Sequence, residues 1–251
     1  MTGNACHRCG DSLDRPARLH RAPTQPLCRT CRLAPPAFVR AVAFGLYQGR
    51  MKDAIHAFKY DRLYPIAGRL GRMLARAIAQ LAEVAPAQML VVPVPLHRQK
   101  HQQRGFNQAR ALTEHALEVL KKSHPQWKLS LASSALLRQR PTKSQAGLTV
   151  RERRQNMRGA FAVSDPEAVR GKDILIIDDI LTTGATAREA ARALVKAGAA
   201  SVWVATLARA RRVNESQSNE HQEHSGDRPD TDGLNTGIES SDRSSQHQPS
   251  F

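Results

Sequence analysis

Hydrophobic and polar residues follow two different periods along the middle of the chain. Apolar residues recur at helical spacing in four segments: 51–60, 65–81, 107–122 and 186–197. Shorter apolar runs predict four strands: 41–47, 89–94, 174–177 and 201–207. The run Ile174–Ile177 has no polar alternation, which is typical of a strand covered on both faces. Asn107 and Gly198 are placed to begin one helix and to end another. Strands alternating with helices predict an α/β fold with a mostly parallel sheet flanked by helices.

This pattern stops near residue 212. Residues 213–251 contain eight acidic and two basic residues, and their sizeable apolar residues are Val213, Leu234, Ile238 and Phe251. So few apolar side chains cannot bury enough surface to offset the conformational entropy of the chain. We therefore predict a disordered acidic tail at 213–251.

Charge and composition narrow the class of protein. Lys and Arg total 38 against 22 Asp and Glu, which gives a net charge of +16. The acidic tail accounts for −6, so residues 1–212 carry +22, a charge that suits polyanionic partners. No apolar run approaches the roughly 18 residues that span a bilayer, and the first residues are too polar for a signal peptide. We expect a cytoplasmic protein without membrane insertion, and not a secreted disulfide scaffold.

All four cysteines lie near the beginning of the chain. Cys6, Cys9, Cys28 and Cys31 form the pattern C-x2-C-x18-C-x2-C, in which two turns can supply four thiolates to one tetrahedral zinc ion. The alternatives are two disulfides or four free thiols, and a reducing compartment disfavours the disulfides. We expect a structural zinc site that folds a small module at 1–38, with no open position for catalysis.

The segment 174–186 carries the most specific chemistry. A buried run delivers Asp178 and Asp179, a turn containing Thr182, Thr183 and Gly184 follows, and a helix then begins near Thr186. Ligands of open α/β sheets bind beyond the carboxyl ends of the strands, and amides at a helix N-terminus favour phosphate. Carboxylates suit ribose hydroxyls, or Mg²⁺ held through water. These features predict a site for a 5-phosphorylated ribose.

Two other interpretations of the acidic pair remain. It is similar to the Walker-B element of nucleotide hydrolases, but that interpretation needs a G-x-x-x-x-G-K-[ST] loop, and Gly171-Lys172 is followed by Asp173. The pair could also be an acidic strand end that only caps the next helix.

The string Asp-Asp-Ile-Leu-Thr-Thr-Gly-Ala-Thr at 178–186 resembles the phosphoribosyl-diphosphate (PRPP) binding loop of type I phosphoribosyltransferases. More narrowly, residues 1–212 resemble the ComF family, which is linked to natural competence and the use of external DNA. The blocks that carry this resemblance are the cysteine pairs, 92–97, 104–108, 138–145, 154–161 and the Asp-Asp loop.

The resemblance implies a phosphoribosyltransferase-like domain at 39–212 that binds PRPP with Mg²⁺. Asp178 and Asp179 would be catalytic. The residues that would bind PRPP are Asp178, Asp179, Thr182, Thr183, Gly184, Ala185 and Thr186. The segment 95–108 occupies the place of a diphosphate loop, with candidate donors His97, Arg98, Lys100, Arg104 and Asn107. The stretch 138–158 would supply a mobile loop over the site, in which Thr142, Gln145, Arg154 and Asn156 are the most suggestive polar residues.

Two functions follow from these features. An active transferase would join the phosphoribosyl group to a nitrogen acceptor, which nothing in the sequence identifies. The alternative is a basic adaptor of DNA uptake that binds single-stranded DNA through 97–104 and 138–154, works with other DNA-uptake proteins and has no transferase turnover. Phe106 would then be either a base-stacking residue or a core anchor.

Overall fold

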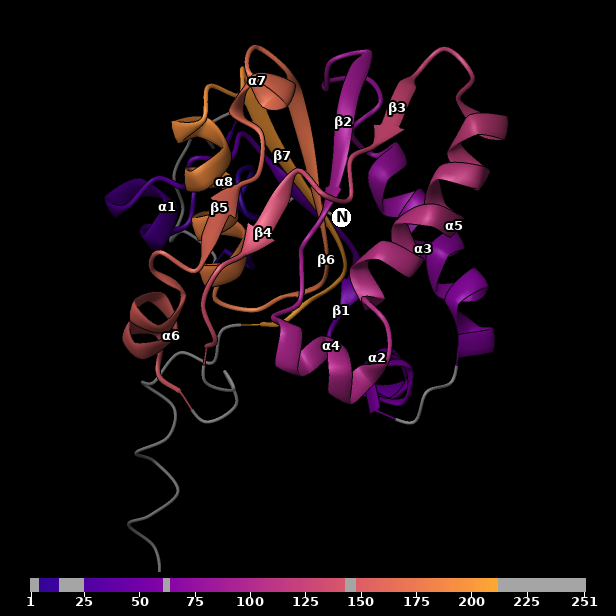
Figure 1. Cartoon of the computed structure of the whole chain (residues 1–251), viewed down its shortest axis with the longest axis horizontal. Coiled ribbons are helices and arrows are strands. Elements are labelled where there is room, and N and C mark those ends of the chain that lie inside the picture. Colours follow the sequence, from indigo (N-terminus) through magenta and orange to yellow (C-terminus); the bar gives the residue numbers. More distant parts are fainter. Residues whose placement is uncertain (1–4, 14–24, 61–63, 143–147, 212–251) are drawn as a thin grey trace, which may run out of the picture. The chain divides into compact units, whose positions relative to one another are not determined.

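The computed structural model describes residues 5–13, 25–60, 64–142 and 148–211 (Figure 1). The chain divides into two compact units, 1–212 and 213–251, and every described residue belongs to the first. The predicted acidic tail and the predicted loop residue Gln145 therefore lie outside the described residues. None of the described helices is long and apolar enough to cross a membrane.

A parallel sheet forms the centre of the first unit. Its five strands run in the order β1-β7-β6-β2-β3, and every neighbouring pair is parallel. Their bounds are Ala41–Leu46 (β1), Gln88–Pro93 (β2), Lys128–Leu131 (β3), Asp173–Leu181 (β6) and Ser201–Arg209 (β7). The prediction of a parallel α/β sheet is confirmed, and so are its four strands. The pattern missed β3, a short edge strand whose side chains are mostly exposed and which therefore lacks an apolar run.

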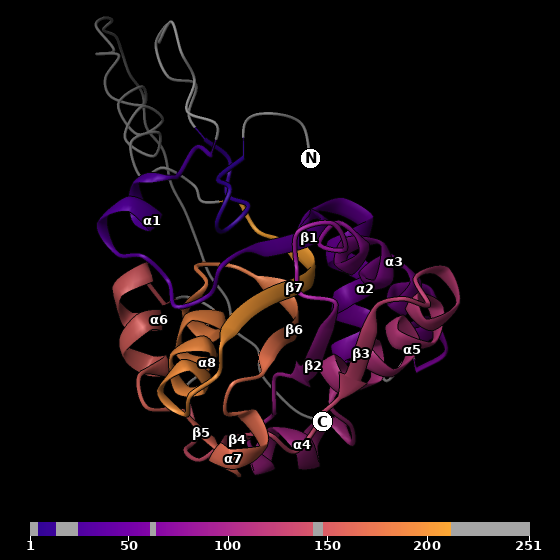
Figure 2. The same ribbon diagram turned by 90° about the horizontal axis from the view of Figure 1, so that it is seen from above.

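Helices cover both faces of this sheet (Figure 2). One side holds α2 (Gly49–Tyr60), a short 3-10 helix η1 (Tyr64–Ile66), α3 (Ala67–Ala79) and α5 (Gln108–Ser123), and the other side holds α8 (Ala185–Lys196). Each face has its own apolar cluster. Ile174 and Ile176 of β6 point into the cluster with α8, whereas Leu175 and Ile177 point into the cluster with α3 and α5. This two-sided burial explains why the sequence of β6 shows no alternation.

Strand β6 is longer than its apolar run. It continues to Leu181 because β7 runs beside it, and Asp178 pairs with Thr206 while Leu181 pairs with Arg209. Asp178 and Asp179 are therefore part of the strand rather than of the turn after it. Backbone pairing with a neighbour, which side-chain polarity does not reveal, decides where this strand ends.

Several short elements complete the unit, and the hydrophobic pattern predicted none of them. They are α1 (Arg29–Leu33), α4 (Arg98–Arg104), β4 (Leu136–Arg138), α6 (Val150–Met157), β5 (Phe161–Val163) and α7 (Pro166–Val169). The segment 95–108, predicted as a loop, contains the helix α4, which has no buried residue and hence no apolar stripe. Part of the predicted mobile loop is the helix α6, which Thr149 and Glu152 begin with a capping box.

Candidate sugar-phosphate site and four-cysteine cluster

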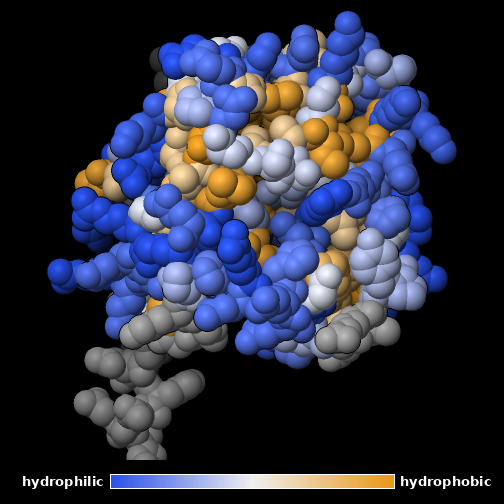
Figure 3. All heavy atoms as spheres, viewed as in Figure 1, coloured by the Kyte–Doolittle hydropathy of each residue, from blue (hydrophilic) through white to orange (hydrophobic). Residues whose placement is uncertain are grey.

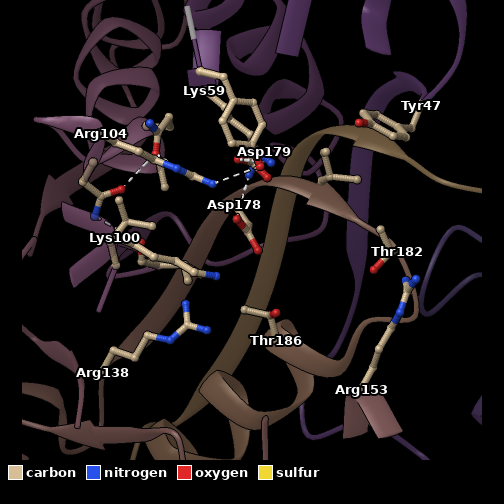
Figure 4. Close-up of a pocket in the computed structure, with 17 residues that line it drawn as sticks. Tyr47, Lys59, Lys100, Arg104, Arg138, Arg153, Asp178, Asp179, Thr182 and Thr186 are labelled. Atoms are coloured by element: carbon tan, nitrogen blue, oxygen red, sulfur yellow. Dashed lines mark hydrogen bonds and ion pairs between the residues drawn. The ribbon is translucent and has the colours of Figure 1, made fainter. Parts of the chain in front are cut away.

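A pocket of about 320 Å³ lies where β2 and β6 end (Figure 4). In Figure 1 this is the lower end of the sheet, between α4 and α6. Figure 3 shows that the surface around these two helices is polar, while apolar side chains gather over the strands above them. Seven of the residues expected to bind PRPP line the pocket: Lys100, Arg104, Asn107, Asp178, Asp179, Thr182 and Thr186.

Thr183, Gly184 and Ala185 form the turn behind this lining. Gly184 precedes α8 with a φ of +77°, a conformation that favours glycine. A Cβ atom there would approach nothing closer than 3.8 Å, so backbone conformation rather than space calls for the glycine. Thr183 is buried, and its Oγ1 accepts a hydrogen bond from the Ala185 amide at 3.4 Å. The turn therefore shapes the helix start, while Thr182 and Thr186 border the pocket.

The two carboxylates differ in their partners. Asp179 forms an ion pair of 2.8 Å with Lys59 of α2, and the two side chains are only 14% and 16% exposed. Asp178 Oδ1 accepts a hydrogen bond from the Asp179 amide at 2.9 Å. Its carboxylate lies in the pocket, where loss of hydration and the neighbouring Asp179 charge raise the pKa of Asp178 to about 7. Burial alone would lower the pKa of Lys59, but Asp179 and Asp178 together raise it.

Cations surround the carboxylates on two sides. Figure 4 shows Lys100, Arg104 and Arg138 on one side of Asp178, and Arg153 on the other side, beside Thr182. Burial and the neighbouring positive charges lower the pKa of both Lys100 and Arg138. Within the part of the chain that the structure describes, the ion pair of Lys59 with Asp179 is the one salt bridge among the residues that line the pocket. The pocket therefore has a surplus of positive charge at each end.

Buried donors add to this surplus. Arg104 donates to Gln108 Oε1 at 3.1 Å and stacks over the Tyr60 ring at 5.1 Å. Gln108 Nε2 and Arg138 Nε are buried and have no acceptor among the described residues. A pocket with spare cations and donors suits a ligand that is rich in acceptor oxygens and negative charge.

The remaining predicted residues have other places. His97 caps α4 by accepting from the Gln99 amide, and Arg98 is exposed outside the pocket lining. Asn107 caps α5 as predicted and also donates to Val94 O at 3.1 Å, which ties the helix to the end of β2. Arg154 does not line the pocket. It borders a second hollow of about 550 Å³ with Arg151, Gln155, Arg158, Glu189 and Arg192.

Sequence reasoning missed three cations of the pocket. Arg138 and Arg153 lie in or beside the blocks that carry the family resemblance, so those blocks held a signal for them. Lys59 had no such signal. It reaches Asp179, 120 positions further along the chain, because α2 packs beside the end of the sheet.

The four cysteines converge as their spacing predicts. All four Sγ atoms lie within 4.8 Å of one another, and Cys9 Sγ is 3.7 Å from Cys28 Sγ. None forms a disulfide. Four sulfurs bound to one zinc ion at about 2.3 Å would be separated by about 3.8 Å, so these cysteines fit a tetrahedral zinc ion. Hydrogen bonds with Cys31 and Cys9 lower the pKa of Cys28 to about 6, whereas hydrogen bonds within the same cluster raise the pKa of Cys9 and of Cys31.

Sequence comparison finds relatives of this chain among phosphoribosyltransferase-type, competence and DNA-utilisation proteins. A family model described as a phosphoribosyl transferase domain matches residues 112–229. DNA utilization protein YhgH of Escherichia coli (strain K12) is 35% identical over 184 residues, which cover 72% of this chain and 77% of that protein. Competence protein F of Haemophilus influenzae is 29% identical over 209 residues (82% and 84%). Competence protein ComFC of Bacillus subtilis (strain 168) is 29% identical over 217 residues (83% and 79%).

Fold and family match together define a phosphoribosyltransferase-type domain, built on a mostly parallel sheet and preceded by a four-cysteine cluster that could hold a metal ion. The chain belongs to the ComF family of competence and DNA-utilisation proteins.

Proposed function

We propose that this protein binds PRPP with Mg²⁺ at the pocket and transfers the phosphoribosyl group to a nitrogen acceptor during the use of external DNA. One observation carries the proposal: the carboxylates lie in the middle of the pocket, and cations lie at both ends. PRPP has the matching pattern, since a ribose with free hydroxyls separates a 5-phosphate from a diphosphate. The names of the relatives support the link with DNA utilisation.

Each part of the pocket has a role in this proposal. Thr182, Thr186, Arg153 and the amides of the 182–186 turn hold the 5-phosphate. Asp178 and Asp179 orient the ribose hydroxyls. Magnesium, when bound, neutralises diphosphate charge. Lys100, Arg104 and Arg138 stabilise the diphosphate as the bond to the anomeric carbon breaks. Lys59 holds Asp179 in place and offsets the repulsion between the two carboxylates.

A binding experiment tests the two ends of the pocket separately. Calorimetry measures the affinity of Mg-PRPP and of ribose 5-phosphate, which lacks the diphosphate. We expect Arg104→Gln to weaken PRPP binding and to change ribose 5-phosphate binding little. Arg153→Gln should weaken both ligands. Binding of PRPP no tighter than binding of inorganic tripolyphosphate would contradict the proposal.

A turnover experiment tests the chemistry. Diphosphate release from PRPP is followed with a panel of bases, amines and nucleic acids as acceptors. The Asp178→Asn, Asp179→Asn variant is the control, since it keeps the shape of the site and removes its negative charge. Release that depends on an acceptor and disappears in this variant supports a transferase. A cell that carries the variant and still uses external DNA normally would separate the pocket from DNA utilisation.

A specific observation favours a second function, the binding of single-stranded DNA. Arg151, Arg154, Arg158 and Arg192 are exposed around one hollow, and the structure places a single acidic residue, Glu189, in its lining. Such a cluster suits a phosphate backbone. Stacking by Phe106 has no support, since this ring packs edge-on against Phe58 and Tyr64.

Fluorescence anisotropy with labelled oligothymidine tests this second function. Affinity should fall steeply with salt because binding releases counterions. It should fall in an Arg151→Gln, Arg154→Gln, Arg158→Gln variant and stay unchanged in the Asp178→Asn, Asp179→Asn variant. The opposite result would assign DNA contacts to the pocket instead.

The metal of the cysteine cluster is zinc in this proposal, because four thiolates in a closed site suit that ion. A site of four thiolates fits a reducing, cytoplasmic compartment, where thiols are kept reduced.

A further inference from the structure

Two arginines connect the cysteine cluster to the turn at 182–184. The first, Arg209, lies at the end of β7. Its Nη2 is 3.1 Å from Asp11 Oδ1, and its Nη1 donates to Leu181 O at 2.8 Å and also to Thr182 O. Nε of Arg209 has no hydrogen-bond partner among the described residues. One guanidinium therefore joins Asp11, two residues after the first cysteine pair, to the carbonyls of Leu181 and Thr182.

This connection is buried, with Asp11 5% exposed and Arg209 3% exposed. A buried ion pair adds little net stability, because loss of hydration offsets most of the attraction. The planar guanidinium fork is directional, so it reaches the Asp11 carboxylate and both carbonyls only when all three are in place. The pair therefore contributes a fixed geometry more than it contributes stability.

Asp11 in turn depends on the first cysteine pair. The Cys6 amide donates to Asp11 O at 2.7 Å, and the Gly10 amide donates to Cys6 O at 2.8 Å. A metal ion that fixes Cys6 and Cys9 would therefore also fix Asp11.

The second arginine reaches the other cysteine pair. Arg188 lies in the first turn of α8, and its amide donates to Gly184 O at 2.8 Å. Its Nη1 donates to Ala34 O at 2.7 Å, and its Nη2 lies 3.9 Å from Cys31 Sγ. One end of the turn is thus tied to the Cys6–Cys9 pair and the other end to the Cys28–Cys31 pair.

We propose that the four-cysteine cluster positions the 182–184 turn through Arg209 and Arg188, so that metal binding and sugar-phosphate binding strengthen each other. The inference rests on the proposed function only for the identity of the ligand. Both arginines are positioning residues, because they act through the turn and neither lines the pocket. Coupling between two binding sites is reciprocal, so each ligand must raise the affinity of the other by the same factor.

The test measures the affinity of ribose 5-phosphate for the full chain with its zinc, after zinc removal, and after zinc is restored. Ribose 5-phosphate needs no magnesium, so chelation affects only the cysteine site. We expect zinc removal to weaken binding at least about tenfold, and saturating ribose 5-phosphate to raise zinc affinity by the same factor. Restored zinc should restore binding.

Variants separate coupling from general damage. The Asp11→Asn, Arg209→Met double variant removes both charges, which avoids an unpaired buried ion. It should keep its zinc and lose most of the tenfold effect. Arg188→Met, at a partly exposed position, should lose part of it. Lys196→Met lies two turns further along α8 at an exposed position and should keep the whole effect. An equal effect of zinc removal in all these proteins would overturn the inference.

Hydrogen exchange gives a measurement that needs no ligand. Zinc-loaded protein that bound neither PRPP nor ribose 5-phosphate would contradict the proposed function but not the coupling. In that case zinc removal should still speed exchange of the amides at 182–187 in the wild type and in Lys196→Met, and much less in the double variant. Unchanged exchange at these amides in the wild type would overturn the coupling itself.

Discussion

The cysteine cluster gathers four thiols within 4.8 Å, whereas the pocket sets two carboxylates among five cations. In the pocket, Gln108 Nε2 and Arg138 Nε are buried without an acceptor among the described residues. The cluster is buried and has the size of one ion, so it suits a metal that stays. The pocket is open and its charges lie at two separate ends, so it suits a ligand that enters and leaves. Under the proposed function, the first unit would hold both a structural site and an exchangeable site.

The largest expected effect tests the closed site. Cys28→Ser removes one of four thiolates, so the protein should lose its zinc and the fold of roughly its first 40 residues, because metal binding supplies folding free energy there. Metal analysis and circular dichroism measure both effects. His7→Ala is the matched control, since four thiolates already complete the site, and it should retain one zinc per chain. Wild-type protein prepared without chelators that contained no zinc would refute the assignment.

The next effect separates binding from stability in the open site. Asp179→Asn should weaken Mg-PRPP binding, and it should cost about 2 kcal/mol of unfolding free energy, because it leaves Lys59 unpaired in a nearly buried place. The Lys59→Met, Asp179→Asn double variant removes both charges and should regain the stability without regaining the affinity. Urea unfolding and calorimetry measure the two quantities. Loss of stability in both variants would mean that the pair is chiefly structural.

Adjacent arginines of α6 give a sharper comparison of the two hollows. Arg153 lines the pocket, whereas Arg154 borders the second hollow. Arg153→Ala should weaken ribose 5-phosphate binding about tenfold, which is the scale of one charge-assisted contact. Arg154→Ala should leave this affinity unchanged and weaken DNA binding, if DNA binds. Equal effects of both variants on ribose 5-phosphate would mean that long-range charge, rather than contact, controls affinity.

Asp178 is expected to reduce stability in a pH-dependent way. Its pKa of about 7 exceeds the value of about 4 for an unfolded aspartate, so between these pH values the folded state holds a proton that the unfolded state has released. The contribution of Asp178 to stability therefore falls as pH rises through this window. Asp178→Asn should raise the unfolding free energy by about 1–2 kcal/mol at pH 8, since the side chain is only partly buried, and by less at pH 5.5. Urea unfolding at both pH values measures the difference, and a gain independent of pH would contradict it.

The smallest effect concerns two glycines with the same backbone requirement. Gly184 and Gly171 have φ values of +77° and +65°, and an added Cβ would be strained but not crowded at either position. Both Gly→Ala variants should lose about 1 kcal/mol of stability. Only Gly184→Ala should also weaken ribose 5-phosphate binding, because it changes the turn beside the pocket. Equal affinity in the two variants would show that the turn does not contribute to binding.

Much of this architecture could be predicted from local features of the sequence. The cysteine spacing predicted the cluster, because each C-x2-C turn brings its own two thiols together and needs little from the rest of the fold. The run Ile174–Ile177 predicted a doubly covered strand, and the string at 178–186 predicted residues that line the pocket. Such features act over a few positions, where backbone geometry alone decides which side chains meet.

Only the tertiary structure decided the features that depend on distant segments. Lys59 meets Asp179 because α2 and β6 come together at one end of the sheet. The helix α4 has no buried residue, so the hydrophobic pattern could not predict it. Arg153 and Arg154 are consecutive arginines, yet they line different hollows. Successive residues of a helix point in different directions, and the position of α6 decides what each side chain faces. Arg209 reaches Asp11, 198 positions earlier in the chain, and also holds the carbonyl of Thr182. Local pattern cannot predict such contacts, because they form only after separate elements pack and bury their charges together.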